Sequence, residues 1–304
     1  DQLSDLHQRM SQPWAESIVQ EILDTTSNIG NASSPTRLLS DTDLEDWQTY
    51  DRVPQWMLAG DERFTDRSKL GRNMEIFTVS TCADQRAFVI RNGLYAFTAA
   101  LVLQPENDRL RENALRYLRA PLKHQRWQLP GWYQLWDHSE LAPDGDGEWY
   151  GTATYLECLP IAADLLDQWL MPQDRYTLHR RIAEHCSRVE DDYYVGRSWF
   201  FGGYQGEDTP IVNQFTSLMS GFCLGALSLK GLDRRAERWL DLGVSQLLRS
   251  LDATGSDGAF FEGTSYASAT FERIYLAAYA LQRAGERRLI EHPLLKNYPY
   301  WLMH

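Results

Sequence analysis

The stretch IVNQFTSLMSGFCLGALSLKG, residues 211–231, decides the expected fold of this chain. Its large apolar residues recur at positions i, i+4, i+7, i+8 and i+11, which is the spacing of one face of an α-helix. Those residues are Ile211, Phe215, Leu218, Met219 and Phe222. Gly231 ends the helix, because glycine readily adopts the left-handed conformation that closes a helix C-terminus. Residues 234–251 then form an amphipathic pattern that ends near Gly255, so an apolar helix is followed by an amphipathic one.

The same alternation recurs elsewhere along the chain. Residues 86–103 are apolar nearly all round, and Pro105 followed by acidic residues marks the start of an amphipathic helix that includes Leu118. Residues 155–170 are apolar, with Pro160 marking a kink or a restart, and residues 172–185 are amphipathic. Further helices are expected at 13–24 and 265–283, and no alternating strand pattern stands among them.

Buried inner helices sheathed by amphipathic outer helices would produce this rhythm. We therefore expect an all-α fold, an incomplete (α/α) toroid or one of about five to seven hairpins. We expect a single domain of residues 1–304, with N-terminal helices and connecting segments in about 1–85 and the main hairpins in 86–304. An irregular helical bundle or a solenoid is the alternative, and the lack of a short-period repeat weakens the solenoid.

Composition narrows the function classes. The chain has 304 residues, 43% hydrophobic and 24% charged, which is typical of a globular protein. The net charge of −12 argues against a nucleic-acid binder, although a few focused cations can still dominate the potential inside a cleft. No apolar run approaches the roughly 18 residues of a membrane-spanning helix. Residues 1–4 lack the basic start and apolar block of a secretory signal.

The sequence gives little support for a metal or a cofactor. The four cysteines show no C-x-x-C spacing, and three of them lie in apolar helical stretches that suit small buried hydrophobic residues. The histidines show no metal-binding spacing. Asp144, Asp146 and Glu148 resemble the start of a calcium loop, but Trp149 stands where the turn glycine is required. We interpret this run as a solvated turn, with a glycosidase acid pair as the weaker alternative.

Two connecting segments are rich in aromatic and polar residues, 130–151 and 193–204. Long connections are usually functional when ordered, and exposed aromatic faces stack well on sugar rings. The candidate sugar-binding residues are Trp132, Trp136, His138, Trp199 and Tyr204. The alternative is that these aromatic residues close the ends of the toroid.

Asn213 and Tyr266 lie 53 positions apart, and each places a polar group at the mouth of an apolar helical run. An amide and a phenol suit β-elimination on uronic-acid sugars, because the amide can neutralise the charge of the uronate carboxylate and the phenol can transfer a proton. Taken alone, the residues are read more simply as a helix cap and a packed aromatic residue.

Three motifs carry a family resemblance. They are LPIAADLL at 159–166, Asn213-Gln214-Phe215 with the small-residue helix that follows to Leu229, and DGAFFEGTSY at 257–266. Residues 149–300 resemble the α/α toroid domain of the heparinase II/III-type polysaccharide lyases, which include oligoalginate lyases.

The resemblance implies a lyase that cleaves 4-linked uronic-acid glycans by β-elimination, without a cofactor. It aligns Asn213 with the residue that neutralises the uronate carboxylate, with Gln214 as the substitute if the register differs by one. It aligns Tyr266 with the tyrosine that transfers the proton and includes Glu262 in the site. Arg197 and Arg273 are the cations we expect to lower the pKa of the tyrosine.

The resemblance further implies an acidic polysaccharide or oligosaccharide as substrate and a periplasmic or secreted location in bacteria. Relatives follow the toroid with a β-sandwich domain, so such a domain or a second chain is an expected partner. The acidic composition favours an unsulfated substrate such as alginate over heparin.

Two alternatives stay open at this stage. A toroid glycoside hydrolase acting on unsaturated uronides would need two opposed carboxylates. A non-catalytic glycan-binding toroid would keep its binding after loss of both Asn213 and Tyr266. The sequence leaves open the particular uronate, endo or exo action, and syn or anti elimination.

Overall fold

The computed structural model describes residues 8–28, 72–128, 148, 150–195 and 213–303, and in these residues the regular structure is entirely helical. The expectation of an all-α fold is confirmed for this part of the chain. Side chains are described in these ranges except at 27–28 and 72–82. The helices are η1 (Pro13–Ala15), α2 (Glu16–Asn28), α5 (Arg72–Leu103), α6 (Asp108–Leu122), α7 (Tyr150–Leu165), η5 (Asp167–Trp169), α8 (Pro172–Val195), α10 (Asn213–Ser228), α11 (Ala236–Thr254), α12 (Thr264–Arg283) and α13 (Pro293–Met303).

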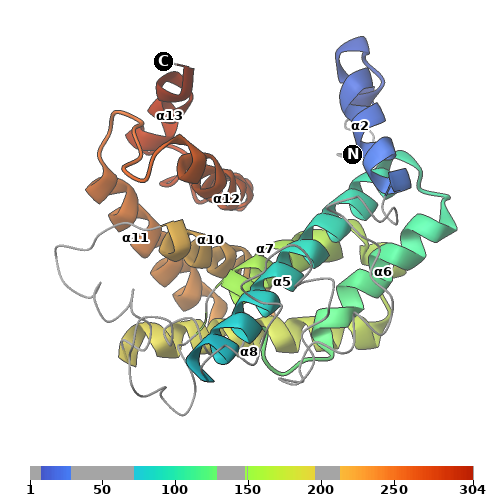
Figure 1. The fold of residues 1–304 in the computed structure, drawn as a ribbon, viewed down its shortest axis with the longest axis horizontal. Coiled ribbons are helices and arrows are strands. Elements are labelled where there is room, and N and C mark those ends of the chain that lie inside the picture. Colours follow the sequence, from blue (N-terminus) through green and yellow to red (C-terminus); the bar gives the residue numbers. More distant parts are fainter. Residues whose placement is uncertain (1–7, 29–71, 129–147, 149, 196–212, 304) are drawn as a thin grey trace.

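The helices form two layers along an arc. Helices α5, α7, α10 and α12 pack each against the next, and α6, α8, α11 and α13 each pack against the helix that precedes them. Figure 1 shows α2 and α13 at the two ends of this arc. The apolar helices of the sequence pattern are the inner layer, and the amphipathic ones form the outer layer, because only the outer helices need a solvated face.

The inner helices α5 and α7 run in the same direction. Near the start of α7, the backbone N–H of Gly151 donates a hydrogen bond at 2.9 Å to the carboxyl group of Asp84, which lies about three turns into α5. Two turns further along both helices, Arg91 Nε lies 2.5 Å from Glu157 Oε1. Contacts that advance together along two helices require parallel axes.

Helices α10 and α12 share this direction. The Tyr150 hydroxyl contacts Asn213 at the start of α10, and Glu262, just before α12, bonds to the same asparagine. Further along, Arg273 of α12 bonds to Thr154 of α7 at 3.3 Å. The N-terminal ends of α7, α10 and α12 therefore lie together at one end of the inner layer.

Close packing of α7 against α10 depends on a glycine. A Cβ on Gly221 would lie 2.3 Å from the carbonyl oxygen of Ala153, well inside van der Waals contact. The backbones of α7 and α10 approach closely only because residue 221 has no side chain.

One segment, Ala83–Leu103 of α5, is long and apolar enough to cross a membrane by length and composition, and half of it is buried inside the protein. Its Arg91 is ion-paired to Glu157 of α7, and its apolar residues Ile90, Leu94 and Phe97 are in the common core. A core helix of a helical protein passes the same test, and these contacts favour that interpretation.

Some expected boundaries were wrong. Helix α5 begins at Arg72, well before residue 86, and α8 continues to Val195. Helix α7 begins at Tyr150 and runs through Pro160 without a break. Helix α13, Pro293–Met303, was not expected at all, although Leu294, Leu295 and Tyr298 are buried against the neighbouring helices. The expected bounds of α10, α11 and α12 are correct to within a few residues.

Candidate functional site

Asn213 is the first residue of α10, and its side chain is only 4% exposed. Its backbone N–H donates to Glu262 Oε2 at 2.8 Å, and its Nδ2 donates to Glu262 Oε1 at 3.0 Å. Its Oδ1 accepts a hydrogen bond from the hydroxyl of Tyr150. The helix-cap interpretation is therefore incomplete, because the amide is held by two side chains from other segments.

These contacts determine which way the amide faces. A carboxylate can only accept hydrogen bonds, so Asn213 must turn its nitrogen toward Glu262 and its oxygen toward Tyr150. The nitrogen carries two hydrogens, and Glu262 takes one of them. Among the described residues no contact uses the second hydrogen, which leaves one N–H donor for a ligand.

Tyr150 is the first residue of α7 and is partly buried. Burial raises the pKa of its phenol far above the ordinary value, and the charges of Asp84, Glu262 and Tyr266 act in the same direction. The charge of Arg273 opposes this shift of the pKa. Tyr150 is therefore a neutral hydrogen-bond donor at any ordinary pH. The groups that shift its pKa include Glu262, which also bonds to Asn213.

Tyr266 lies in the first turn of α12 and is 55% exposed. It lies four residues after Glu262, which bonds to Asn213, and its electrostatic effect on Tyr150 agrees with a position close to these residues. Within the described part of the chain its hydroxyl makes no hydrogen bond. The interpretation of Tyr266 as a packed core aromatic residue is wrong, since its side chain is open to an incoming molecule.

Arg273 lies two turns along α12 from Tyr266, on the same face of the helix. Its side chain is buried, with Nη1 at 3.5 Å from Glu157 Oε2 and the guanidinium 5.5 Å from the ring centroid of Phe88. Glu157 is also bound by Arg91 and by the hydroxyl of Tyr95. Arg273 thus belongs to a buried ion cluster beneath the site, where its charge lowers the pKa of Tyr150.

Asp84 lies beside the start of α7 and is 6% exposed. Gly151 N–H lies 2.9 Å from its Oδ1 and 3.0 Å from Oε1 of Gln128. Burial raises the pKa of Asp84 to about 7, while hydrogen bonds with Gly151 and Gln128 partly offset the shift. A carboxyl that keeps its proton near neutral pH is a common feature of functional sites.

The site thus brings together three helix N-termini. The starts of α7, α10 and α12 carry Tyr150, Asn213 and Tyr266 respectively. Helix N-termini present partial positive charge, which favours an anion. The formal charge of Glu262, which is bound to Asn213, opposes a highly charged anion, so the arrangement suits one carboxylate better than several sulfates.

The remaining predicted site residues fall into two groups. Gln214 follows Asn213 on α10 and is half-buried. The others lie outside the described residues: Trp132, Trp136, His138, Arg197, Trp199 and Tyr204.

Glu148 was expected to lie in a solvated turn, but its side chain is buried. It is 6% exposed, accepts a hydrogen bond from Thr152, and lies 3.3 Å from Nδ1 of His185. The ring of His185 stacks on Trp127 at a centroid distance of 4.0 Å. The pKa of Glu148 is lowered, because contacts with His185, Thr152 and Arg188 outweigh the opposing effect of burial. Glu148 anchors the start of α7 to α8.

Cysteine and metal chemistry gain no support in the described part of the chain. Cys158, Cys186 and Cys223 are buried free thiols, as expected of small hydrophobic residues. Burial raises the pKa of all three thiols, so they are poor nucleophiles. Among the described residues no group of three or more His, Cys, Asp or Glu side chains could hold a metal ion.

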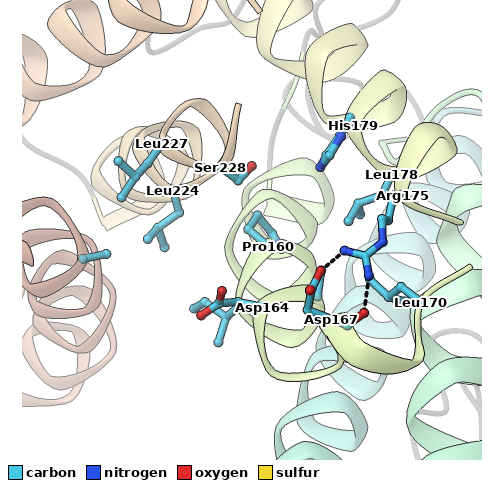
Figure 2. A pocket seen from close by; sticks show the side chains of 13 residues that line it. Pro160, Asp164, Asp167, Leu170, Arg175, Leu178, His179, Leu224, Leu227 and Ser228 are labelled. Carbon is cyan, nitrogen blue, oxygen red and sulfur yellow. Dashed lines mark hydrogen bonds and ion pairs between the residues drawn. The ribbon is translucent and has the colours of Figure 1, made fainter. Parts of the chain in front are cut away.

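A cavity of about 320 Å³ lies at the other end of the inner helices. Figure 2 shows it between the C-terminal halves of α7 and α10 and the start of α8, with the ion pair of Asp167 and Arg175 on one side. Helix α10 has 16 residues, so this cavity lies about 20 Å from Asn213. Of the predicted site residues that the structure describes, none lines this cavity.

Sequence reasoning missed two residues of the site, Tyr150 and Asp84. Their partners are 63 and 67 positions away in the chain, so local pattern carries no trace of the contacts. The one usable signal for Tyr150 was its place at the start of an apolar helix, which is also the place of Asn213 and Tyr266.

Neither a protein-family model nor a curated protein matches this chain. The resemblance to the heparinase II/III-type lyases therefore stays a prediction carried by the sequence motifs.

Proposed function

We propose that this chain is the incomplete (α/α) toroid of a polysaccharide lyase, acting on 4-linked uronic-acid glycans by β-elimination. The observation that carries the proposal is the amide of Asn213. It is held in one orientation where three helix N-termini meet, and one of its N–H groups has no partner among the described residues. The two-layered arc of parallel inner helices supports the toroid part of the proposal.

Asn213 has the first chemical task. The C5 proton of a uronate is too weakly acidic to be removed while the neighbouring carboxylate carries its full charge. In this proposal, the N–H of Asn213 that no described residue uses and the N-terminal dipoles of α7 and α10 stabilise that carboxylate as charge grows on it. A neutral donor suits this task beside Glu262, which already supplies a negative charge.

Tyr266 has the second task. The phenolate form of Tyr266 is the base that takes the C5 proton, and the electron pair of that C–H bond forms the C4–C5 double bond. The C4–O4 bond breaks, and the leaving O4 takes a proton from the same phenol if the elimination is syn. The 55% exposure of Tyr266 allows a sugar chain to reach it.

Substrate and location follow the same proposal. An acidic polysaccharide or oligosaccharide is the substrate class, and one with few sulfates fits the formal negative charge of Glu262 beside Asn213. A periplasmic or secreted location and a partner domain or chain complete the proposal, on the family resemblance alone.

A second candidate function rests on Asp84. Its pKa is raised to about 7, and Asp84 and Glu262 both act on Tyr150. A pair of carboxyl groups with different pKa values is what a glycoside hydrolase uses. The Oδ1 of Asp84, however, is engaged by the N–H of Gly151. A structural carboxyl at the start of α7 accounts for these facts more directly, so we favour the lyase.

The test is to follow the ultraviolet absorbance of the unsaturated product with alginate, heparan sulfate, chondroitin, hyaluronan and ulvan. Tyr266→Phe should lower the rate by about 10²-fold or more, because it removes the proton-transfer group. Tyr279→Phe is the matched control, since Tyr279 is an equally exposed tyrosine on the same helix (60% against 55%).

A rise in absorbance on one polymer that Tyr266→Phe abolishes and Tyr279→Phe preserves would support the proposal. Absence of product from every polymer would contradict it for this chain. Equal rates for the two variants would contradict the role of Tyr266.

A further inference from the structure

We propose that Tyr150 is a positioning residue of this site, which holds the amide of Asn213 in the orientation that binds the ligand carboxylate. This inference rests on the proposed function for its catalytic meaning. The contact itself, from the hydroxyl of Tyr150 to Oδ1 of Asn213, is part of the structure.

Two anchors hold the amide, and they do different things. Glu262 accepts hydrogen bonds from the backbone N–H and from Nδ2 of Asn213. These bonds turn the nitrogen of the side-chain amide toward the segment that precedes α12. A single bond to Nδ2 still allows the amide plane to rotate about that bond. The hydroxyl of Tyr150 at Oδ1 fixes the opposite corner, so the direction of the second N–H is set.

Tyr150 is suited to this role by its own surroundings. Because it stays protonated, it always donates a hydrogen bond and never presents a negative phenolate to Oδ1. Its backbone begins α7, where the N–H of the next residue, Gly151, bonds to Asp84. The ring of Tyr150 lies 6.1 Å from the ring of Phe88, centroid to centroid, so the side chain is packed as well as bonded.

Asp84 and Glu148 extend this support to the base of α7. Asp84 holds the N–H of Gly151 from α5, and Glu148 holds the hydroxyl of Thr152 and contacts His185 of α8. The start of α7 is thus tied to two other helices, so Tyr150 is a rigid support for Asn213.

The experiment compares wild type, Tyr150→Phe and Tyr275→Phe. Tyr275→Phe is the matched control, because the hydroxyl of Tyr275 also donates one hydrogen bond, to the carbonyl of Leu295, away from the site. Selective ¹⁵N labelling of the eight asparagines, with Asn213→Ala for assignment, makes the Asn213 amide visible by NMR. Its ¹⁵N relaxation reports how rigidly the amide is held.

In wild type and Tyr275→Phe we expect the Asn213 amide to be as rigid as the helix backbone. In Tyr150→Phe we expect it to become mobile on the ps–ns timescale. Lyase turnover should fall about 10- to 100-fold in Tyr150→Phe, with a smaller change in KM, because the misaligned donor matters most in the transition state.

An Asn213 amide that stays rigid in Tyr150→Phe would overturn the inference, since Glu262 alone would then hold it. Unchanged turnover together with a mobile amide would overturn it equally. If wild type cleaves no polymer, the proposed function fails separately, and the relaxation data still decide whether Tyr150 holds Asn213.

Discussion

Asp84 links the electrostatics of a single residue to the stability of the protein. Its pKa is raised to about 7 by burial, so the folded state holds a proton that the unfolded state has released above its ordinary pKa of 3.8. The contribution of Asp84 to the free energy of unfolding therefore falls as pH rises between about 4 and 7, and it is constant above that range.

Replacing Asp84 by asparagine should remove this pH dependence. The amide oxygen can still accept the hydrogen bond from Gly151, and no charge is buried at high pH. Relative to wild type, we expect Asp84→Asn to gain stability by about 1 kcal/mol for each pH unit between about 4 and 7. Urea unfolding at a series of pH values measures this difference.

Asp164→Asn, at an exposed position of α7, is the control for the loss of one negative charge. A difference between Asp84→Asn and wild type that does not change with pH would show that Asp84 is ionised in the folded protein throughout the range.

At the scale of helices, the contact of α7 with α10 positions Tyr150 against Asn213. A Cβ at Gly221 would meet backbone, the carbonyl of Ala153 at 2.3 Å, and backbone cannot rotate away as a side chain can. Gly221→Ala should therefore destabilise the protein by about 1–3 kcal/mol, although alanine is the better helix former.

Thermal or urea unfolding measures that change, and Ser228→Ala, at a half-buried position of the same helix, is the control. An unchanged or raised stability of Gly221→Ala would mean that α7 and α10 can separate without cost. Tyr150 and Asn213 would then not be held as firmly as we infer.

The sequence predicts the helices whose signal is local and misses those that depend on distant contacts. The apolar spacing and the closing glycines located α10, α11 and α12, because periodicity and capping lie within the segment itself. Helix α13 was missed because Pro299 interrupts its pattern and its stability comes from packing, as in the stacking of Tyr298 on Phe271 at 4.0 Å.

The site divides in the same way. Asn213, Glu262 and Tyr266 could be predicted from motifs around two helix starts. Tyr150 and Asp84 could not, because their roles arise only when α5, α7 and α10 are brought together. Burial of Glu148 was likewise invisible in a run of glycine and acidic residues that is typical of a solvated turn.

At the scale of the whole molecule, the net charge of −12 and a polyanionic substrate have to be reconciled. The proposed site does so with neutral and dipolar groups: the Asn213 amide, the exposed phenol of Tyr266, and three helix N-termini. Arg273 and Arg91 lie beneath it and are ion-paired with Glu157, so they stabilise the arc of inner helices more than they attract a ligand.

The measurement that tests the lyase claim most directly is cleavage of the preferred uronic-acid polymer in H₂¹⁸O, with the products weighed by mass spectrometry. Elimination consumes no water, so we predict products without ¹⁸O, each new non-reducing end carrying the C4–C5 double bond. Hydrolysis adds one water for each bond that is cut. One ¹⁸O on the fragment with the new reducing end, together with a saturated new non-reducing end on the other fragment, would contradict the account and favour Asp84 and Glu262 as a hydrolase pair.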